Sequence, residues 1–552
     1  MSRCSPGCAS PKVVPVLEAA AVIGRQIDRG LLCLVVDLSD DEVDDVIAEL
    51  EDALVLERWG TGNRQFRHEL LREVAAELAP PSVRRALHAK VADALSGAGE
   101  PDWQLIAGHY EHAERFDEAA SAYQRASTDA LLRGALAEAR AYLTRALTHL
   151  DQAASAPDRD RLEMALRLER GRLTRAVEGY QSRDAAADYE RCLQLAGTDL
   201  RDEELFATLA ALAGYYVTRA DLRRVVQVLE ALRTGLEHGR QWFDSVIAAQ
   251  FALVAFLRGE FDAAISHFEA AIAGLAAAAP HKIDAEWFLV NEPLAYAHTH
   301  LAWARLIRGD LTTAETELAH AADRAEKLGF PLGPYIIGYA RSVEIGMRIE
   351  AGQLDRAAVL AADLSELGER HGFDIWRSAG AMWQAVVRGL DAVGADDVEQ
   401  TALATHIATV STLLDSARKV GLNLFLTFYD GVLGRLLIAA GHPQAARERL
   451  EVGLELGRET GMCFYDAELL RLRAQTHDEP AARLADINAA LELARRQGAT
   501  LFELRAALDD FEVRGASASA AVADAGNRIP ANNAWPELAR AKAALSEQMP
   551  HI

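Results

Sequence analysis

An acidic run is the part of the sequence with the clearest potential for chemistry. Asp40, Asp41 and Asp44 fit the D-D-x-x-D pattern that binds magnesium diphosphate, and Mg²⁺ prefers carboxylate oxygens. Ser39, however, precedes Glu42 by three residues, which is the capping-box spacing of a helix start. The helix macrodipole alone favours carboxylates in such a first turn. Because only 7% of the residues are aromatic, too few for a cavity that shelters carbocations, we expect a capped helix here and not an enzyme.

Histidines at short spacings are the next candidates, as metal ligands. His68 starts a motif similar to H-E-x-x-H, but Arg72 occupies the position of the second His. Two further pairs lie on predicted helices, where they could share a face: His109/His112 and, less well, His298/His300. Solvated histidines on helices are the common case, so we expect no metal site from these residues.

The cysteines give no stronger signal. The chain has five, a small and odd number that suits a reducing compartment. Cys4 and Cys8 form a close pair, but no second pair stands near them and their setting is rich in Pro, Ser and Gly. We therefore expect an untethered N-terminus over residues 1–12, no metal and no cofactor.

Bulk properties restrict the partners. The net charge of −24 over 552 residues would repel phosphate backbones, so we expect no direct nucleic acid and no anionic membrane partner. No run approaches the roughly 18 apolar residues of a membrane span, and we expect a cytoplasmic protein. Ala, Leu, Arg and Glu dominate while Pro is sparse, which favours an all-α fold.

Internal repeats give the strongest structural signal. From Trp103 the positions Ile106, Ala107 and Tyr110, followed by Ala119, Tyr123 and Ala126, match the tetratricopeptide pattern. Small residues at these positions let two antiparallel helices approach closely, and the aromatic residues fill the space between neighbouring repeats. Weaker copies follow: Ala139/Leu143/Ala146, Ala185/Tyr189/Cys192, Val225/Leu229/Leu232, Ala264/Phe268/Ala271, Ala314/Leu318/Ala321, Ala357/Ala361/Leu364 and Ala446/Leu450/Gly453.

Turn signals separate the two helices of several copies. They start at Gly259, Gly309, Gly352 and Gly441, where Gly can end one helix in the left-handed conformation and a following Asp can cap the next. The wide gap between Ala357 and Ala446 predicts one more degenerate repeat, at residues 376–390 and 401–419. The sequence thus predicts a tetratricopeptide-like solenoid over residues 101–513, a flexible linker over 514–534 and a C-terminal helix over 535–552.

The first hundred residues have a different pattern. A helix from Ser39 with apolar residues on one face is followed by two short strand-like runs around the turn Gly60-Thr61-Gly62-Asn63. Helices followed by a hairpin predict a winged-helix-like segment over residues 13–100. Residues 37–52 hold nine carboxylates and no Lys or Arg, which argues against DNA reading by this helix.

At this point a family resemblance is visible over nearly the whole chain. Its residues are the strings Leu17–Gly24, Leu38–Glu42, Gln65–Glu73, Arg84–His88 and Ala489–Ala506. They resemble the region after the ATPase core in signal-transduction ATPases with numerous domains (STAND-type AAA+ regulators), of the kind attached to class III nucleotide cyclases or transcription regulators. In that family a winged-helix segment joins the nucleotide-binding domain to a tetratricopeptide-like sensor array.

The chain departs from this family at the P-loop. There is no G-x-x-x-x-G-K-[ST] and no Gly-Lys dipeptide, so the family's ATPase activity is not carried over. No G-x-S-x-G or G-x-G-x-x-G is present either. The family's nucleotide-contacting winged-helix His maps to His68, which we expect to be a relic contact or a locally packed helix-start residue.

These patterns together predict a non-catalytic regulatory binding module. The solenoid groove would hold a protein, a peptide or a small effector, and the N-terminal segment would act on an ATPase, cyclase or transcription partner on another chain. Polar first-helix positions are the groove candidates: Arg219, Arg258, His300, Arg305 and Arg348. The alternatives are a freestanding scaffold or co-chaperone-like adaptor, and a truncated remnant of a larger regulator. The regulator predicts a Walker A sequence in the upstream DNA or in a neighbouring chain.

Overall fold

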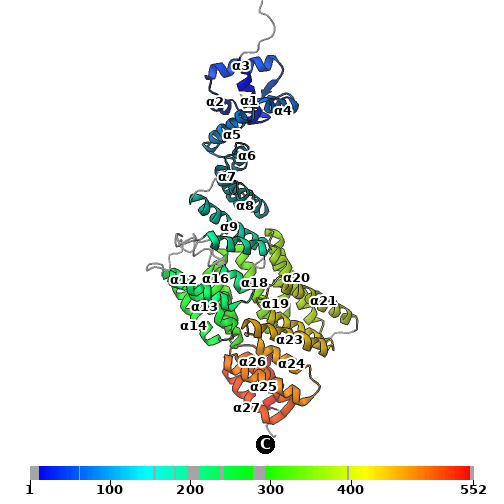
Figure 1. The fold of residues 1–552 in the computed structure, drawn as a ribbon. Helices are drawn as coiled ribbons and strands as arrows, with labels where there is room; N and C mark the ends of the chain where they lie inside the picture. The colour runs from blue at the N-terminus through cyan, green and yellow to red at the C-terminus, as the bar shows by residue number, and fades with distance from the viewer. Residues whose placement is uncertain are drawn as a thin grey trace, which may run out of the picture. The chain divides into compact units, whose positions relative to one another are not determined.

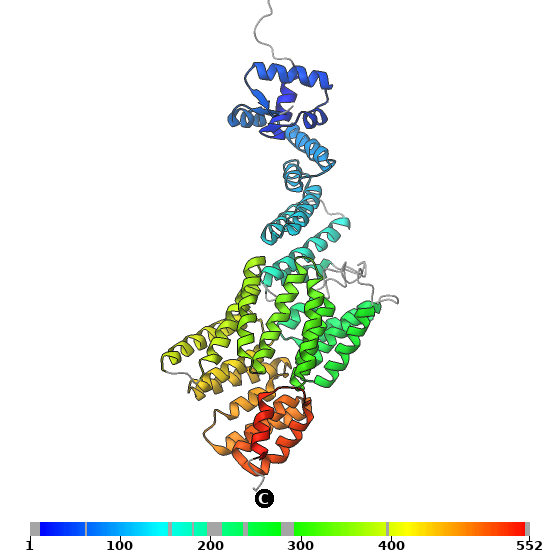
Figure 2. The same ribbon diagram turned by 180° about the vertical axis from the view of Figure 1, so that it is seen from behind.

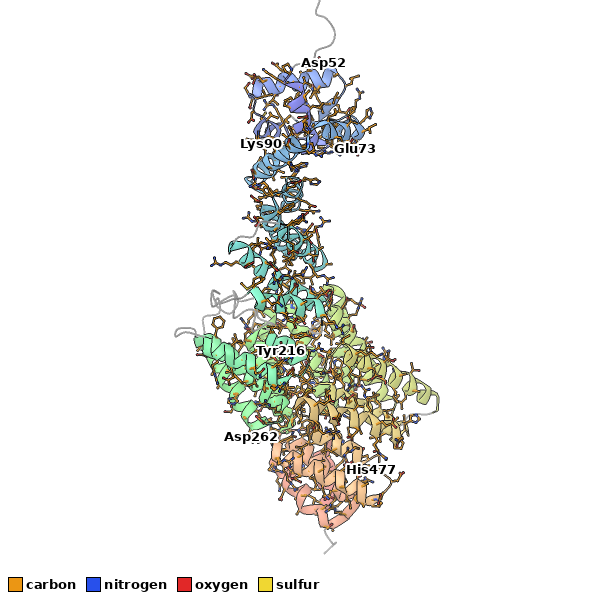
Figure 3. All side chains as sticks on the ribbon, viewed as in Figure 1. Asp52, Glu73, Lys90, Tyr216, Asp262 and His477 are labelled. Carbon is orange, nitrogen blue, oxygen red and sulfur yellow. The ribbon has the colours of Figure 1, made fainter. Side chains whose placement is uncertain are left out.

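The chain folds into two compact units, Met1–Arg170 and Gly171–Ile552, which are described separately (Figures 1 and 2). The computed structural model describes residues 11–60, 63–152, 157–178, 182–195, 212–235, 241–277, 292–393 and 397–546. The prediction for the N-terminus, with Cys4 and Cys8, lies outside these residues. Helices dominate both units. Within each unit, side chains fill the space between neighbouring helices (Figure 3).

The first unit begins with helices around a small sheet. The helices are α1 (Val13–Ile23), α2 (Arg29–Val35), α3 (Asp40–Asp52), α4 (Glu69–Leu78) and α5 (Pro81–Ser96). The strands β1 (Gln26–Ile27), β2 (Leu56–Trp59) and β3 (Asn63–Phe66) form an antiparallel sheet of order β1-β3-β2. The expected strand pair is therefore present. Apolar residues from α1, α2, α3 and β3, including Val16, Leu32, Val46 and Phe66, form one buried core.

The acidic run lies at the N-terminus of α3, as expected. The Ser39 side chain accepts a hydrogen bond from the Glu42 backbone N–H, and the Glu42 carboxylate accepts one from the Ser39 backbone N–H. Arg29 pairs with Asp44 at 2.6 Å, and Lys12 pairs with Glu42 at 2.6 Å. The capping box and the pairs of Glu42 and Asp44 agree with the expected capped helix start.

The first tetratricopeptide-like motif follows in the same unit. Its helices are α6 (Trp103–His112), α7 (Phe116–Leu132) and α8 (Leu136–Leu150). The small positions Ala107 and Ala119 are completely buried, and Tyr123 is 2% exposed between the helices. This confirms the close approach of α6 and α7 that the small residues predicted. Helix α9 (Pro157–Glu178) comes next in the chain.

The second unit is a series of antiparallel helices. Residues 212–218 are helical. The helices with printed bounds up to residue 391 are α10 (Arg183–Leu195), α12 (Leu222–Gly235), α13 (Gln241–Leu257), α14 (Phe261–Ala277), α16 (Pro293–Ile307), α17 (Leu311–Glu326), α18 (Leu332–Glu350), α19 (Leu354–His371) and α20 (Asp374–Asp391). The remaining helices are α21 (Asp397–Lys419), α22 (Leu426–Ala439), α23 (Pro443–Thr460), α24 (Asp466–Ala474), α25 (Pro480–Gln497), α26 (Thr500–Arg514), the 3-10 helix η1 (Gly515–Ala518), α27 (Ser519–Arg528) and α28 (Pro536–Ser546).

These helices pair as tetratricopeptide-like repeats. In each repeat a first helix packs against a second: α13/α14, α16/α17, α18/α19, α20/α21, α22/α23 and α24/α25. Each first helix also contacts the first helix of the next repeat, in the series α13, α16, α18, α20, α22, α24, α26. The first helices therefore form the inner layer of a superhelix. The small residues of the predicted second helices are buried, as Ala264, Ala314, Ala357 and Ala446 show.

The repeat predicted in the gap before Ala446 is present as α20 and α21. The predicted turn glycines are confirmed as well, because Gly259, Gly309, Gly352 and Gly441 all have φ between 70° and 88°. Side chains with a Cβ atom rarely adopt this left-handed conformation. The turn residues thus end each first helix and reverse the chain.

The superhelix of the second unit closes on itself. Backbone N–H groups of Asn423 and Phe464 donate to the carbonyls of Thr218 (2.8 Å) and Leu257 (3.1 Å). The Trp535 indole donates to the Gly309 carbonyl at 2.7 Å, across 226 residues of sequence. Each of these carbonyls lies at the end of a first helix. In an open solenoid each repeat contacts only its neighbours. Here the turns also dock on segments about 200 residues later in the chain.

A buried ionic network joins the end of α18, before the Gly352 turn, to the C-terminal helices. The Arg505 guanidinium contacts the Glu350 carboxylate, donates to the Glu350 carbonyl at 2.8 Å and to Glu537 at 2.7 Å. Burial alone would raise the pKa of Glu468, but the nearby Arg471 and Arg505 lower it to about 2. Every charge in this group therefore has an opposite partner, as burial of ions requires.

The segment 514–534 differs from its predicted flexible linker. It contains η1 and α27, and Val522 and Ala525 of α27 are completely buried. Its Ala-rich composition supports a helix once an apolar face can pack, and α27 packs against α26 and α28. Helix α28 lies within the predicted C-terminal helix.

Within the described residues, none of the helices is both long enough and apolar enough to cross a bilayer.

Candidate functional site

The five predicted groove residues lie at separate places in the second unit. Arg219 stacks its guanidinium over Tyr215, 5.3 Å from the ring centroid, where the chain turns after residues 212–218. Arg258 is exposed at the end of α13, beside a polar hollow that also includes Glu230 and His267. Neither side chain lines the apolar cavity of about 470 Å³ in this unit.

The other three candidates have structural partners. Arg305 pairs with Glu269 at 2.5 Å, in the space between neighbouring repeats. Arg348 is 2% exposed and is bound by Glu344, Glu315 and Gln353 at the end of α18. His300 is completely buried in an aromatic cluster. The structure therefore does not bring the five residues together in one groove.

His68 is in the first unit, at the N-cap position of α4. Its side chain is exposed and makes no capping hydrogen bond. No nucleotide-binding element of the chain lies in the described residues around it, so its role stays a prediction.

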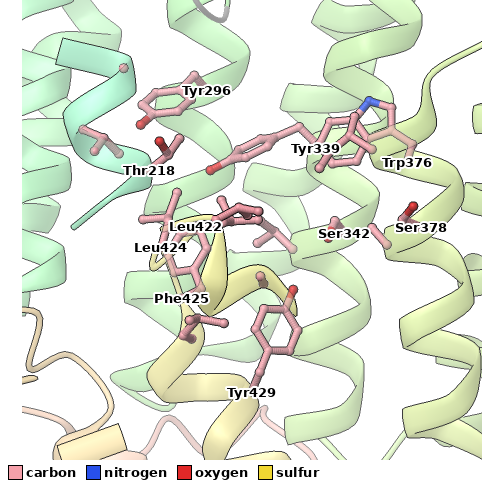
Figure 4. Close-up of a pocket in the computed structure, with 18 of the residues that line it drawn as sticks. Thr218, Tyr296, Tyr339, Ser342, Trp376, Ser378, Leu422, Leu424, Phe425 and Tyr429 are labelled. Atoms are coloured by element: carbon pink, nitrogen blue, oxygen red, sulfur yellow. The ribbon is translucent and has the colours of Figure 1, made fainter. Parts of the chain in front are cut away.

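An apolar cavity of the second unit lies inside the superhelix (Figure 4). It is a cavity of about 470 Å³, lined mainly by the first helices of successive repeats. Its aromatic lining consists of Tyr296, Trp303, Tyr339, Trp376, Phe425 and Tyr429. First helices face inward because they contact one another along the series, so large residues on their inner faces project into the centre.

A short loop closes one side of this cavity. The loop runs from Val420 to Phe425, between α21 and α22, and its Leu422, Leu424 and Phe425 line the cavity. The backbone N–H groups of Asn423 and Leu424 both donate to the Thr218 carbonyl, at 2.8 and 2.9 Å, and the Asn423 amide donates to the Arg219 carbonyl at 3.1 Å. We call residues 420–425 the closing loop.

Phe425 holds the closing loop in an unusual backbone conformation. Its φ is 62°, in the left-handed region that a residue with a Cβ atom rarely occupies. The ring packs against Trp303 (centroids 5.0 Å apart) and Phe464 (5.8 Å), and it is 8% exposed. Aromatic packing of this kind offsets the backbone strain, which is of the order of 1–3 kcal/mol.

A fixed hydrogen-bond relay places one hydroxyl in the apolar interior. The Nδ1 of His300 lies 2.9 Å from the Tyr296 carbonyl, so Nδ1 carries the proton and donates. Nε2 then accepts from the Tyr339 hydroxyl at 2.8 Å. Burial lowers the pKa of His300 to about 4, so the ring is neutral at pH 7. Figure 4 shows the Tyr339 hydroxyl directed towards Thr218 and Leu424.

A second polar group lies deeper among the first helices. The Trp383 indole donates to the Ser342 hydroxyl at 3.0 Å, and Tyr429 lines the same cavity. Burial raises the pKa of Tyr429 well above its usual value, so its phenol stays protonated. Ser342 and Tyr429 therefore add neutral hydroxyl groups to the lining.

The lining is mostly apolar. Among the described residues that line the cavity, the charged ones are Glu178 and Asp374, and there is no His, Cys, Lys or Arg. Asp374 is exposed at the start of α20 and pairs with Arg377 at 2.7 Å. Without a base beside them, the lining hydroxyls of Thr218 and Ser342 are not activated nucleophiles. The cavity suits a neutral, largely apolar ligand.

Sequence reasoning missed this site because it searched for charged residues. The usable signal is the run of aromatic residues on first helices, which we assigned to packing alone. The closing loop gives almost no local signal, since its closure depends on Thr218 about 200 residues earlier in the chain.

Fold and site together define a tetratricopeptide-like helical repeat protein with an internal apolar cavity. No family model matches the chain. A curated relative, described as uncharacterized protein R02095 from Rhizobium meliloti (strain 1021), is 24% identical over 527 residues, covering 89% of this chain. The chain spans 48% of the length of that relative.

Several solved structures are similar to this chain at low identity. A STAND protein with a tetratricopeptide repeat sensor from Pyrococcus horikoshii is 13% identical, with a TM-score of 0.35, over 75% of this chain and 65% of that one. A Rap protein complexed with competence and sporulation factor is 10% identical, with a TM-score of 0.41, over 69% of this chain and 99% of that one. Yeast Tom70 is 14% identical, with a TM-score of 0.32, over 81% of this chain and 93% of that one.

Proposed function

We propose that the chain is a non-catalytic regulatory binding module and that the cavity of the second unit is its ligand site. The observation that carries this proposal is the aromatic, largely apolar cavity of about 470 Å³, a volume typical of small-molecule sites. The described lining offers hydroxyl groups and no cation, and its two carboxylates, Glu178 and Asp374, already pair with Ser182 and Arg377. We therefore infer that the ligand is uncharged and largely apolar. A small effector, or the apolar side chains of a partner peptide, meets this description.

In this proposal residues 13–100 form a winged-helix-like adaptor of a cytoplasmic regulator. The three helices followed by an antiparallel hairpin support this view. The adaptor contacts an ATPase, cyclase or transcription partner, and ligand binding in the cavity changes the activity of that partner. A relative about twice as long as the matched region is compatible with such a larger system.

The second candidate is a freestanding scaffold or co-chaperone-like adaptor that binds an extended peptide along an open groove. The closing loop disfavours it, because hydrogen bonds from Asn423 and Leu424 to Thr218 bridge the inner face of the superhelix. The two candidates predict different ligands. A scaffold retains long polar peptides, whereas the sensor takes up compact apolar molecules.

A pair of cavity variants tests the site. Ala379 lines the cavity from α20, and Ala381 lies two residues later on the exposed surface of the same helix. Ala379→Phe fills the cavity, so we expect binding of the neutral fluorophore N-phenyl-1-naphthylamine to weaken about 10-fold or more, which corresponds to about 1.4 kcal/mol. Ala381→Phe is the control and should bind the fluorophore like the parent chain. Equal binding by both variants, measured by fluorescence titration, would contradict the proposed site.

A further inference from the structure

Two histidines and a carboxylate meet between α16 and α17. The Nδ1 of His298 lies 2.6 Å from Glu317 Oε2, and the Nδ1 of His320 lies 3.9 Å from the same oxygen. One potential ligand atom from each residue lies within 4.8 Å of the others. His298 comes from α16, and Glu317 and His320 come from α17, so the group bridges the two helices.

The distances are close to those of a four-coordinate metal site. Bond lengths of about 2.0 Å to nitrogen and oxygen place the ligand atoms of a tetrahedral ion about 3.3 Å from one another. The pair at 2.6 Å is shorter than this and the pair at 3.9 Å is longer, so modest side-chain rotations reach the required geometry. His298 would shift its proton from Nδ1 to Nε2, and the ion would occupy the position of the shared proton.

The surroundings favour a divalent cation at this position. Glu317 Oε2 lies 2.6 Å from the Nδ1 of His298, so an anionic oxygen is already held beside an imidazole nitrogen. The Nε of Arg305 lies 3.7 Å from the other oxygen, Oε1, and leaves Oε2 to the ion. Arg305 also pairs with Glu269, so the two carboxylates and one guanidinium leave a net charge of −1 beside the histidines.

We propose that His298, Glu317 and His320 bind a zinc-class divalent cation, with water as the fourth ligand. Imidazole nitrogens select zinc and its neighbours over magnesium and calcium, which take all-oxygen sites. His298 and Glu317 have side chains 12% exposed, and His320 is 57% exposed, so the ion reaches the site from solvent through His320. Bound metal joins α16 to α17, the helices on either side of the Gly309 turn that Trp535 contacts.

The test uses the full chain carrying Cys4→Ser and Cys8→Ser, which removes the close cysteine pair as a competitor. Zn²⁺ alone is titrated by calorimetry at pH 7.5, and Co²⁺ is titrated by absorption. We expect a saturable site whose cobalt spectrum has visible d–d bands without thiolate charge transfer, and a thermal midpoint about 2 °C higher or more with Zn²⁺.

Two variants and a matched control decide the outcome. His320→Ala removes an exposed ligand without disturbing the core, and Glu317→Gln removes the anionic oxygen. Each should lose one equivalent of Zn²⁺, or weaken its binding about 10- to 100-fold. His477→Ala is the control, because His477 pairs with Asp486 at 3.0 Å but lacks a second histidine. Metal binding by His320→Ala and Glu317→Gln equal to that of His477→Ala, or an unchanged cobalt spectrum, would overturn the proposal.

Discussion

Asp466 shows how this fold changes the chemistry of a single residue. It is the first residue of α24, it is 8% exposed, and one of its oxygens has no hydrogen-bond partner. Burial raises the pKa of Asp466 to about 7, although a hydrogen bond with Cys463 and the charge of Arg458 act in the opposite direction. The carboxyl therefore titrates near neutral pH and not near its unperturbed pKa of about 3.9.

The raised pKa predicts a stability that falls as the pH rises. The folded state binds the proton of Asp466 more tightly than the unfolded state, so this contribution is complete below about pH 4 and is lost as the pH rises through 7. Asp466→Asn keeps a neutral side chain, and we expect it to be more stable than the parent at pH 8 by about 1–3 kcal/mol, with the difference vanishing towards pH 4. Urea unfolding followed by circular dichroism measures this difference.

Asp374→Asn provides the matched control for that measurement. Asp374 is also the first residue of its helix, but its side chain is exposed. Its substitution should leave the pH dependence of unfolding close to that of the parent. A pH-independent difference between parent and Asp466→Asn would show that Asp466 is ionised in the folded chain.

The roles of individual residues were the hardest to predict from the sequence. Arg305 and Arg348 occupy first-helix positions that can face either a groove or a neighbouring helix, and the structure gives both of them carboxylate partners. His300 is buried, and its Nε2 accepts a hydrogen bond from the hydroxyl of Tyr339 on the next first helix. For each of these three residues one partner, Glu269, Glu315 or Tyr339, lies 33 or more positions away in the chain, so local spacing could not identify it.

At the scale of elements the sequence was far more informative. Small residues at fixed spacing predicted the second helices, and Gly followed by a cap residue predicted the turns, because both signals act within one helical hairpin. The short strands β2 and β3 were found from the Gly-rich turn between them. The helical residues of 514–534 were missed because their burial depends on α26 and α28.

Turn glycines with and without a docked neighbour should respond differently to substitution. Gly309 has a φ of 88°, and a Cβ atom added there would lie 2.8 Å from Ile529. Gly441 has a φ of 76°, and a Cβ atom added there would have no neighbour within 4 Å. We expect Gly441→Ala to lower the free energy of unfolding by about 1–2 kcal/mol, from backbone strain alone. Gly309→Ala should cost about 1–3 kcal/mol more, because Ile529 must move.

Urea unfolding of the two glycine variants, followed by tryptophan fluorescence, gives both values. Because the backbone strain is shared, their difference reports the docking of the turn on the C-terminal segment. Equal losses would mean that the contact between Gly309 and Ile529 adds nothing to stability.

For the whole molecule, closure of the superhelix is the property that sets this chain apart from an open solenoid. In an open solenoid each repeat is stabilised by its neighbours, so a local defect has local effects. Here the turn after α16 depends on Trp535, which is 2% exposed. The second unit should therefore couple segments that are far apart in sequence.

Hydrogen exchange measures this coupling directly. Trp535→Ala removes the indole that donates to the Gly309 carbonyl, and we expect amides of residues 305–314 to exchange about 10-fold faster or more, equivalent to at least 1.4 kcal/mol of local stability. Trp376→Ala is the control, because it removes a buried indole that does not contact this turn. If both variants accelerate exchange at 305–314 equally, the effect is global and the coupling is absent.

The closing contacts also restrict how such a chain can evolve. An open repeat array gains or loses a repeat by duplication or deletion with little penalty, because every repeat offers the same neighbour surface. In the second unit an added helical hairpin between Gly309 and Asn423 would displace all three docking segments from their turns, including the partner of Gly309. The number of repeats in that interval is thus set by the pitch of the superhelix, and change must come through loops and surface residues instead.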